Sequence, residues 1–575
     1  CRLERGDDQA AEFELAYPND GPREVHAAAL GIPQDVPIVS ADEAVAAVFV
    51  PDSNPAEDSH EPVADVAEPP APVAPAIAAN EMAARVDELL AACWQQQGIV
   101  PVGTASDAEF MRRVYLDLTG RVPTVSEART FLNDTHPDRR ALLLDELLDR
   151  YDHATHLAAV WRGFLLPDGV DLTRYGVPVE FERRLTKRFR TNVPYNEVVR
   201  ELLLAEGRVT ESGPLMFYTA LKLAPEELAS QTSRVFLGTR MECAQCHDHF
   251  FDDRWTQEDF WAYAAFFARI SRPESKFEMV SPVMRVRDSR RGEVTLPESE
   301  RVIPPKFPAG EPSLDDDAPR RQRLADWITA TDNEHFARAT VNRVWAHLFG
   351  RGLVDPVDDI RATNPASNEA LLEFLAADFR DHGYDIKHLI KTITTSYVFG
   401  LSTTPAERNL SDVKNFSRYY RQRLRAEVLL DAVNDVLGTE EEFAAMPPAS
   451  RATQLWPHRT PSIFLDTFGR PDPNQDPPCE TLSELTTPQV LHLMNSPALE
   501  AKLSLDEAVP AQLAAGDLSK EQIVEEAYLR AYCRFPAADE TQAASELIGE
   551  GEARRRGIED LFWVLLNTPE FAYID

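Results

Sequence analysis

The sequence predicts a mainly α, multi-helical protein of two domains, with a small β insert between them and a disordered N-terminal tether. Three observations support this. Apolar residues recur at helical spacing over most of the chain, apolar and polar residues alternate in one central stretch, and the first part is acidic and rich in proline. A chain of 575 residues exceeds what one hydrophobic core usually organises. We expect a tether at residues 1–77, a helical domain at 78–272, the insert at 273–312 and a second helical domain at 313–575.

The tether is predicted from composition. Residues 51–75 read PDSNPAEDSHEPVADVAEPPAPVAP, which buries too little apolar surface to offset the entropy of ordering. The chain begins with Cys1, as exported bacterial lipoproteins do after signal cleavage, and this predicts a lipid anchor on the Cys1 thiol. We therefore expect an exported protein, periplasmic or on the cell surface, that meets the membrane through this lipid.

Charge and motif content argue against several classes of function. The net charge of −36 argues against nucleic acid as the main partner, because binding to phosphates requires clustered Lys and Arg. We expect no transmembrane helix, since no apolar run of about 18 residues occurs. The sequence also lacks G-x-S-x-G, a glycine-rich phosphate loop and H-E-x-x-H, the motifs of serine hydrolases, P-loop NTPases and zincins.

Helical periodicity recurs along the first domain, beginning near residue 78 and ending a first helix at Gly98. The further helices are expected at residues 107–118, 126–133, 139–150, 156–166, 192–204, 225–237 and 257–270. Residues 278–303 alternate apolar and polar side chains around a turn at 288–292, which predicts short strands. From residue 320 the chain is again expected to be helical.

The segment Cys243-Ala-Gln-Cys246-His247 carries the strongest chemical signal. Two cysteines three apart, followed at once by a histidine, are what covalent attachment of haem c requires. Each thiol can bond one haem vinyl group, and the imidazole can ligate the iron. Other interpretations stay open. Cys243, Cys246, His247 and His249 could hold zinc or iron, and the two cysteines could form a redox dithiol, a disulfide or a structural turn.

The surroundings of this motif are apolar on one side and acidic on the other. An apolar stripe follows at 3–4 spacing and could line a haem crevice, although such stripes more often form core. The stripe comprises Phe260, Trp261, Ala264, Phe267 and Ala268. His249 is too close to His247 in the chain to reach the opposite face of a haem. Candidates for a second iron ligand are Met216, Met279, Met284, His347, His492 and Met494, each more often a core methionine or a hydrogen-bonded histidine.

A second constellation lies in the C-terminal domain and comprises Asn342, Arg343, Trp345, His347, Asp358 and Asp359. On a helix, Arg343 and His347 share a face at i, i+4. This basic pair could face the loop of Asp358 and Asp359 as a binding or acid–base site. The group could equally be a buried ion-pair network that locks helix to loop, the interpretation we favour.

Several phrases resemble a known family. The segments RRVYLDLTGRVPTVSEARTFLND and FLGTRMECAQCHDHFFDDRWTQEDFWAYAAFF resemble the planctomycete cytochrome C-related domain family, whose function is largely uncharacterised. The segment beginning ARATVNRVWAHLFGRGLVDP resembles the partner domain that usually follows it. The resemblance covers roughly residue 82 to the C-terminus and implies a cytochrome-like site in an exported protein. Phe250 and Asp253 depart from the family's pattern without removing an attachment atom.

We therefore expect an exported c-type cytochrome-like protein with one haem c on Cys243, Cys246 and His247. Its role would be electron transfer or a redox reaction with a redox partner protein or another exported protein, and the acidic surroundings would lower the potential. The alternative is a non-haem cell-surface scaffold with a structural metal or a disulfide at the same loop. Whether the protein is an enzyme stays open. The other cysteines are Cys93, Cys479 and Cys533, of which Cys479 and Cys533 could pair in an oxidising exterior.

Overall fold

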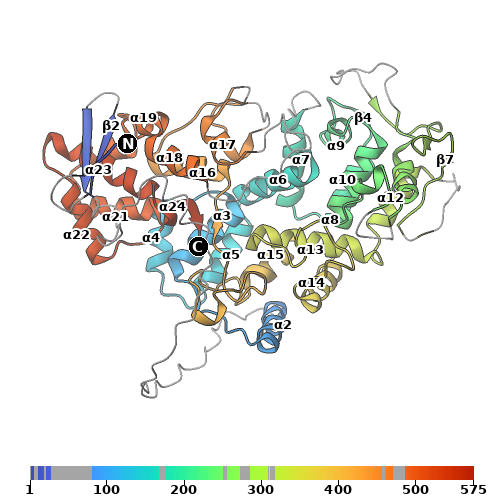
Figure 1. Cartoon of the computed structure of the whole chain (residues 1–575), viewed down its shortest axis with the longest axis horizontal. Helices are drawn as coiled ribbons and strands as arrows, with labels where there is room; N and C mark the ends of the chain where they lie inside the picture. Colours follow the sequence, from blue (N-terminus) through green and yellow to red (C-terminus); the bar gives the residue numbers. More distant parts are fainter. Residues whose placement is uncertain are drawn as a thin grey trace.

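The computed structural model describes residues 81–167, 177–249, 255–271, 285–308, 310, 318–444, 446–455, 460–470 and 486–575, together with three N-terminal strands. The predicted fold class is confirmed, since the described chain is mainly helical and its strands form only small antiparallel groups. Figure 1 shows the helices arranged in sequence-coloured clusters along the long axis of the molecule.

The first half is built almost entirely from helices. They are α2 (Glu81–Gln97), α3 (Asp107–Thr119), α4 (Val125–Asn133), α5 (Arg139–Leu148), α6 (Tyr151–Leu165), α7 (Pro178–Arg190), α8 (Tyr195–Leu203), α9 (Leu215–Ala220), α10 (Pro225–Leu237) and α11 (Gln257–Ala264), with 3-10 turns η3 (Glu242–Gln245) and η4 (Ala265–Phe267). The helix predicted from residue 126 begins one residue earlier. Its N-cap is Thr124, whose hydroxyl accepts from the Glu127 N–H while the Glu127 carboxylate accepts from the Thr124 N–H.

The second half is also helical. Its elements are α12 (Arg320–Ile328), α13 (Glu334–Phe349), α14 (Glu369–Asp381), α15 (Ile386–Thr395), α16 (Ala426–Leu437), α17 (Ile463–Thr467), α18 (Thr487–Asn495), α19 (Pro497–Leu503), α20 (Val509–Ala515), α21 (Lys520–Ala531), α22 (Ala538–Leu547), α23 (Glu552–Leu566) and α24 (Pro569–Ala572), with 3-10 turns η5 (Glu407–Asn409) and η6 (Ala452–Gln454).

All described strands are short and antiparallel. They are β1 (Arg2–Arg5), β2 (Ala11–Tyr17), β3 (Gly21–His26), β4 (Gly207–Arg208), β5 (Arg285–Val286), β6 (Val294–Thr295), β7 (Val302–Ile303), β8 (Gln422–Arg423) and β9 (Tyr573–Ile574). The strands predicted in the insert are present as β5 to β7, where β6 pairs with β7 and β5 pairs with β4 of the first half. In the predicted tether, β1 to β3 form one small sheet, and the rest of residues 1–80 lies outside the described part of the chain.

One apolar core extends through both halves of the chain. Helix α10 packs against α13, and α2 packs against α14 and α15. The buried Arg113 of α3 donates to the carbonyl oxygens of Phe399 and Leu401, far along the chain. Figure 1 shows the C-terminal end beside α3 in the middle of the molecule, where β9 pairs with β8. The two predicted domains are therefore joined by core contacts and not by the insert alone.

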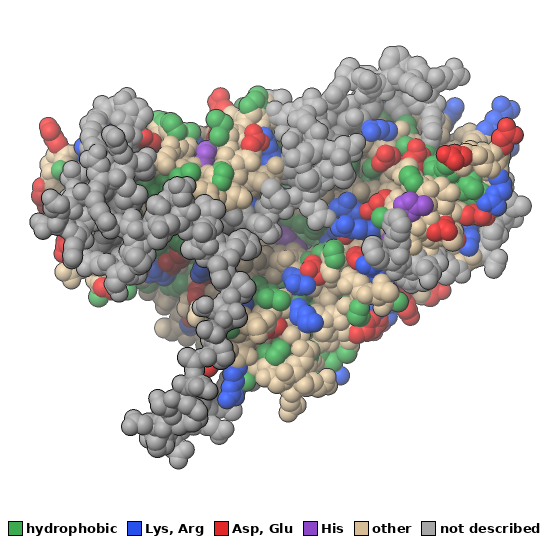
Figure 2. Space-filling view, in the orientation of Figure 1, with side chains coloured by type: hydrophobic (Ala, Val, Ile, Leu, Met, Phe, Trp, Pro, Cys, Tyr) green, Lys and Arg blue, Asp and Glu red, His purple; other side chains and the backbone are tan. Residues whose placement is uncertain are grey.

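The surface view in Figure 2 shows acidic and basic side chains interspersed over the visible face. Among the described residues, no helix combines the length and apolar character needed to cross a membrane.

Candidate functional site

The C-x-x-C-H loop follows directly from the end of α10. Gly238 ends that helix with φ +65°, and a Cβ there would lie 2.6 Å from Cδ1 of Ile360, so the position demands glycine on two grounds. The Ile360 N–H donates to the Gly238 carbonyl oxygen at 2.8 Å. The second half of the chain thus fixes the point at which the loop begins.

Helix α11 holds the loop through hydrogen bonds donated by Gln257 and Trp261. The Gln257 side-chain amide donates to the carbonyl oxygens of Gln245 (3.3 Å) and Cys246 (3.0 Å), and the Trp261 indole donates to Gln245 (3.1 Å). The Gln257 N–H donates to the Asp248 carboxylate at 2.9 Å. These bonds use the backbone of the loop and leave the thiols of Cys243 and Cys246 outside the network they form.

The groups that the sequence singled out lie at the surface. Cys243, Cys246 and His247 are exposed, and neither thiol is in a disulfide. Nδ1 of His247 lies 2.8 Å from the Asp248 carbonyl oxygen, which orients the ring. Partial burial, followed by the charge of Glu242, raises the pKa of the Cys243 thiol. A raised thiol pKa is the opposite of what a redox-active dithiol needs, because the thiolate is the nucleophile.

No three donor atoms of the described residues of this loop lie within 4.8 Å of one another. Within the described part of the chain, three His, Cys, Asp or Glu ligand atoms gather closely enough for a metal only at another place, in α14 and α15. A tetrahedral zinc site requires four ligand atoms around one point. Haem c attachment has no such requirement, because its two thioether bonds and its iron ligand lie at separate points of a large ring.

The apolar stripe after the motif belongs to the core and not to a crevice beside the loop. Phe260 and Phe267 are at most 1 % exposed, and Ala264 is fully buried. Trp261 is half-buried and donates its indole N–H to the loop backbone. The interpretation of this stripe as core, which the sequence favoured over a haem crevice, agrees with the burial of Phe260, Ala264 and Phe267, which pack where α10, η4 and α11 meet.

The described candidates for a second iron ligand are buried or half-buried, whereas Cys243, Cys246 and His247 are exposed. Met216 is buried in the core at 1 % exposure, and Met494 packs against the core as a half-buried side chain. His492 packs against the rings of Phe464 and Phe468. Met279 and Met284 lie outside the described residues.

Asp358 connects the two constellations that the sequence singled out. Its carboxylate, 6 % exposed, accepts from Nε of Arg234 (2.6 Å) and Nε of Arg240 (2.8 Å), and Arg240 lies three residues before Cys243. Burial alone would raise the pKa of Asp358, but Arg234, Arg240 and Arg343 together outweigh it and lower that pKa. The second-domain loop therefore helps to position the end of α10 and the start of the C-x-x-C-H loop.

The other members of the second constellation have structural partners. Asn342 is fully buried and holds the loop of residues 352–357, since its amide donates to the carbonyls of Val354 (2.8 Å) and Val357 (2.9 Å) and accepts from the Val354 N–H (2.9 Å). Arg343 donates to the Arg234 carbonyl and lies over the Phe164 ring. Asp359 pairs with Arg361. A structural network is present, as favoured from sequence, but its ion pairs differ: Asn342 ties the helix to the loop by hydrogen bonds, and Asp358 pairs with Arg234 and Arg240 and not with Arg343.

His347 does not face the loop of Asp358 and Asp359 together with Arg343, as the sequence analysis allowed. Its Nε2 lies 3.3 Å from the Asp117 carbonyl oxygen, and its ring lies 6.0 Å from that of His156, away from Asp358. Burial, followed by the charge of Arg425, lowers the pKa of His347 to about 4. Gly120 permits this arrangement, because a Cβ there would lie 2.3 Å from Nδ1 of His156.

Sequence reasoning missed Asp117 and His156 as members of this buried region. Asp117 is buried, and its burial raises its pKa to about 8 in spite of Arg113 and the hydroxyl of Tyr419. The phrase LDLTGRVP that contains Asp117 predicts only a turn between helices. The signal that could have found it is the spacing of Arg113 and Asp117 at i, i+4 on α3, beside the apolar residues Phe110 and Val114.

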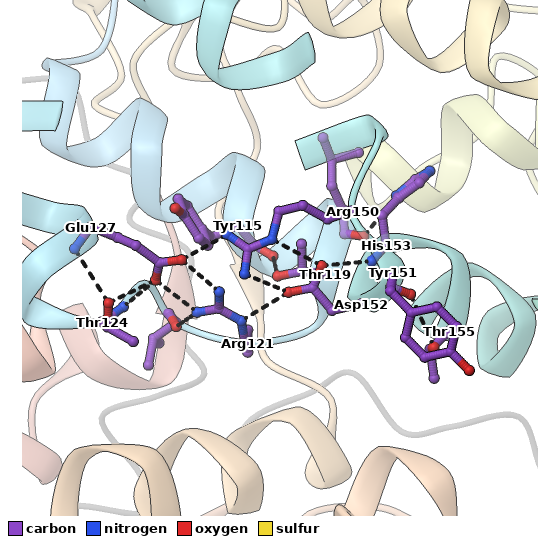
Figure 3. Close-up of polar contacts among 12 residues, drawn as sticks. Tyr115, Thr119, Arg121, Thr124, Glu127, Arg150, Tyr151, Asp152, His153 and Thr155 are labelled. Carbon is purple, nitrogen blue, oxygen red and sulfur yellow. Dashed lines mark hydrogen bonds and ion pairs between the residues drawn. The ribbon is translucent and has the colours of Figure 1, made fainter. Parts of the chain in front are cut away.

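A separate ion-pair network closes the same turn. Figure 3 shows Arg121 and Arg150 placed between Glu127 and Asp152, with Thr124 capping α4 alongside. Arg121 donates to Glu127 at 2.8 Å and to Asp152 at 3.2 Å, and Arg150 donates to Glu127 at 2.7 Å. Each charge has two opposite partners, so this network locks α4 to the start of α6.

The remaining cysteines are not assembled into a described site. Cys533 is buried and has a free thiol, and Cys93 is half-buried and accepts from the Gln97 amide. The predicted pairing of Cys479 with Cys533 is not formed in this structure, because the Cys533 thiol is free. Cys479 and Cys1 themselves lie outside the described residues, and the lipid anchor stays a prediction.

Two protein-family models match separate parts of the chain. Residues 85–272 match the family described as "PSCyt2: Protein of unknown function (DUF1549)", and residues 320–548 match the family described as "PSD1: Protein of unknown function (DUF1553)". This pair is typical of planctomycete proteins. Neither description assigns a cofactor or a reaction. Searches of curated proteins and of solved structures find no match to the chain.

Proposed function

We propose that this protein is a c-type cytochrome-like electron carrier that binds one covalent haem at Cys243, Cys246 and His247. The observation that carries the proposal is the placement of these three side chains. All are exposed, neither thiol is in a disulfide, and α11 holds the loop through its backbone. This donor set fits covalent haem c attachment and does not converge as a zinc site requires.

The residues of the chain would perform three tasks. Cys243 and Cys246 would hold the haem through thioether bonds: each thiol would add across one vinyl group, with its sulfur joined to one carbon and its hydrogen atom to the other, and no group would leave. The His247 imidazole would ligate the iron, with its ring oriented by the Asp248 carbonyl. When bound, haem iron supplies one-electron redox chemistry.

An exposed motif suits exchange of electrons with another protein better than catalysis on a buried substrate, because a partner can approach closely. The carboxylates of Glu242 and Asp248 flank the motif and would stabilise the ferric state, which lowers the potential. A redox partner protein and an exported location belong to the same proposal, and fractionation of the native cells tests the location.

The test is the visible spectrum of protein purified from its native source, denatured in alkaline pyridine and reduced with dithionite. A haem c spectrum that stays with the polypeptide is expected, and Cys246→Ala should abolish the normal two-link attachment. Absence of haem, combined with zinc or iron in elemental analysis of the same sample, would overturn the proposal in favour of a metal-binding scaffold. Absence of both would leave a dithiol or disulfide loop.

A further inference from the structure

A cluster of two imidazoles and one carboxylate lies at the turn between α14 and α15. Asp378 is on the last turn of α14, His382 caps that helix, and His388 is in the first turn of α15. A ligand atom from each lies within 4.8 Å of the other two. The backbone brings these residues together because Gly383 (φ +65°) and Tyr384 (φ +59°) are both left-handed, which reverses the chain in very few residues.

The separations within the cluster are close to those that a bound cation imposes. Nδ1 of His382 lies 3.0 Å from Oδ1 of Asp378, and Nε2 of His388 lies 2.9 Å from Oδ2. Ligand bonds of roughly 2.0–2.1 Å in a tetrahedral site place neighbouring ligand atoms about 3.3 Å apart. Conversion of this cluster into a metal site therefore requires a small change in the separations of the ligand atoms, together with rotation of the two stacked rings so that both ring planes point at the ion.

The buried carboxylate of Asp378 and the C-terminal end of α14 make the surroundings of this cluster favourable to a cation. The Asp378 carboxylate is 2 % exposed and is hydrogen-bonded to Nε2 of His388, while Nδ1 of His382 lies 3.0 Å from the carboxylate and 2.9 Å from the Asp378 backbone carbonyl oxygen. The C-terminal end of α14 carries the negative end of the helix dipole. The imidazole rings are stacked, with centroids 3.8 Å apart and planes at 19°, and each has one nitrogen beside the same carboxylate. Two neutral imidazoles and one carboxylate suit Zn²⁺, Cu²⁺ or Ni²⁺ better than Ca²⁺ or Mg²⁺.

We propose that Asp378, His382 and His388 form a binding site for one divalent transition-metal ion of the zinc class. His382 is 46 % exposed, so the fourth position of the ion opens to solvent. On binding, each imidazole nitrogen that donates to Asp378 becomes a ligand, and its proton is carried by the other ring nitrogen of the same side chain. This site is independent of the haem proposal.

The site has a structural consequence for the junction of the two halves. The turn that holds it docks on the first half, where the Tyr195 N–H donates to the Tyr384 carbonyl (2.9 Å) and the Asn192 amide donates to the Asp385 carboxylate (2.8 Å). A bound ion would tie α14 to α15 beside this junction. We therefore expect metal binding to raise the thermal stability of the full chain.

The test is calorimetric titration of the full chain with Zn²⁺ after treatment with a chelator, in a Cys243→Ser/Cys246→Ser background that removes the thiols of the other loop. One equivalent is expected to bind and to raise Tm. His382→Ala should weaken binding at least about tenfold, a typical loss when a metal site is impaired. Because His382 is half exposed, this variant should fold and keep the Tm of the metal-free parent.

A second variant and a matched control complete the experiment. His388→Gln should weaken binding to a similar degree, whereas His136→Ala, which removes another exposed histidine, should leave binding unchanged. Failure of the parent to bind Zn²⁺ up to millimolar concentration would overturn the proposal. Equal affinity and stoichiometry in the parent, His382→Ala and His388→Gln would overturn it as well, by placing the bound ion elsewhere.

Discussion

The C-x-x-C-H loop and the Asp358 network are neighbours, because Arg240, which pairs with Asp358, lies three residues before Cys243. Their polar side chains are placed differently: those of the network are buried or paired, and those of the loop are exposed. The network buries the Asp358 carboxylate between two arginines, and the side-chain amide of Asn342 holds the loop just before Asp358 by hydrogen bonds to its backbone. The loop uses its backbone for attachment to α11 and exposes both thiols and the His247 imidazole. The difference suggests that the network maintains the shape of the region, while the loop keeps chemical groups available.

The largest expected effect on stability comes from Asn342. Asn342→Ala removes two buried hydrogen bonds and one partly buried hydrogen bond and leaves the backbone groups of Val354 and Val357 without these partners, so we expect a loss of about 3 kcal/mol in the free energy of unfolding. Urea denaturation monitored by circular dichroism measures it. Asn495→Ala, at the exposed last residue of α18, is the control and should cost under about 0.5 kcal/mol. A cost below about 1 kcal/mol at Asn342 would show that the loop of residues 352–357 is held by other contacts.

Asp358→Asn should have the next largest effect. It removes the charge that Arg234 and Arg240 share, but these arginines are 41 % and 33 % exposed, so solvent compensates part of the loss. We expect about 2 kcal/mol, below the range for a fully buried pair. The neighbouring Asp359→Asn is the matched control and should cost less than about 1 kcal/mol. Equal costs at the two positions would contradict the distinction between a buried and a peripheral carboxylate.

Acid should weaken the region around His347. The pKa of this buried imidazole is lowered to about 4, so its contribution to stability is present above the unfolded pKa of about 6.5 and is lost as pH falls toward 4. Between pH 7 and pH 5 we expect His347→Gln to lose less stability than the parent, by on the order of 1–2 kcal/mol. Urea denaturation at the two pH values measures this difference, and it isolates His347 from Asp117, whose raised pKa acts in the opposite direction. Identical pH dependence in the two proteins would mean that His347 is solvated.

The smallest effect on stability is expected at the open loop. Cys243→Ser together with Cys246→Ser changes exposed side chains and should alter the free energy of unfolding of the haem-free chain by no more than about 0.5 kcal/mol. The same variant should lose covalent haem, as measured by haem staining after denaturing electrophoresis. Cys533→Ser provides the contrast, because that thiol is buried and its replacement should cost stability while haem attachment persists. A large loss of stability at the loop would support a structural role for its cysteines.

Local signals predicted much of this molecule correctly. The spacing of apolar residues predicts most helices of both halves, because burial of one face imposes that period, and Gly98 and Gly120 end α2 and α3 with left-handed backbone. The short strands of the insert were also predictable from alternation. The metal cluster of Asp378, His382 and His388 was not, since it depends on two consecutive left-handed residues that place α15 against the end of α14.

The sequence by itself determines the helical class, the positions at which helices end, and the presence of a cysteine pair with an adjacent histidine. Each of these depends on residues near one another in the chain. Only the tertiary structure decides that Asp358 pairs with Arg240 beside the C-x-x-C-H loop, that His347 faces His156, and that one core includes both halves. These contacts join residues more than a hundred positions apart. Their partners are chosen by the packing of whole helices, which no local pattern records.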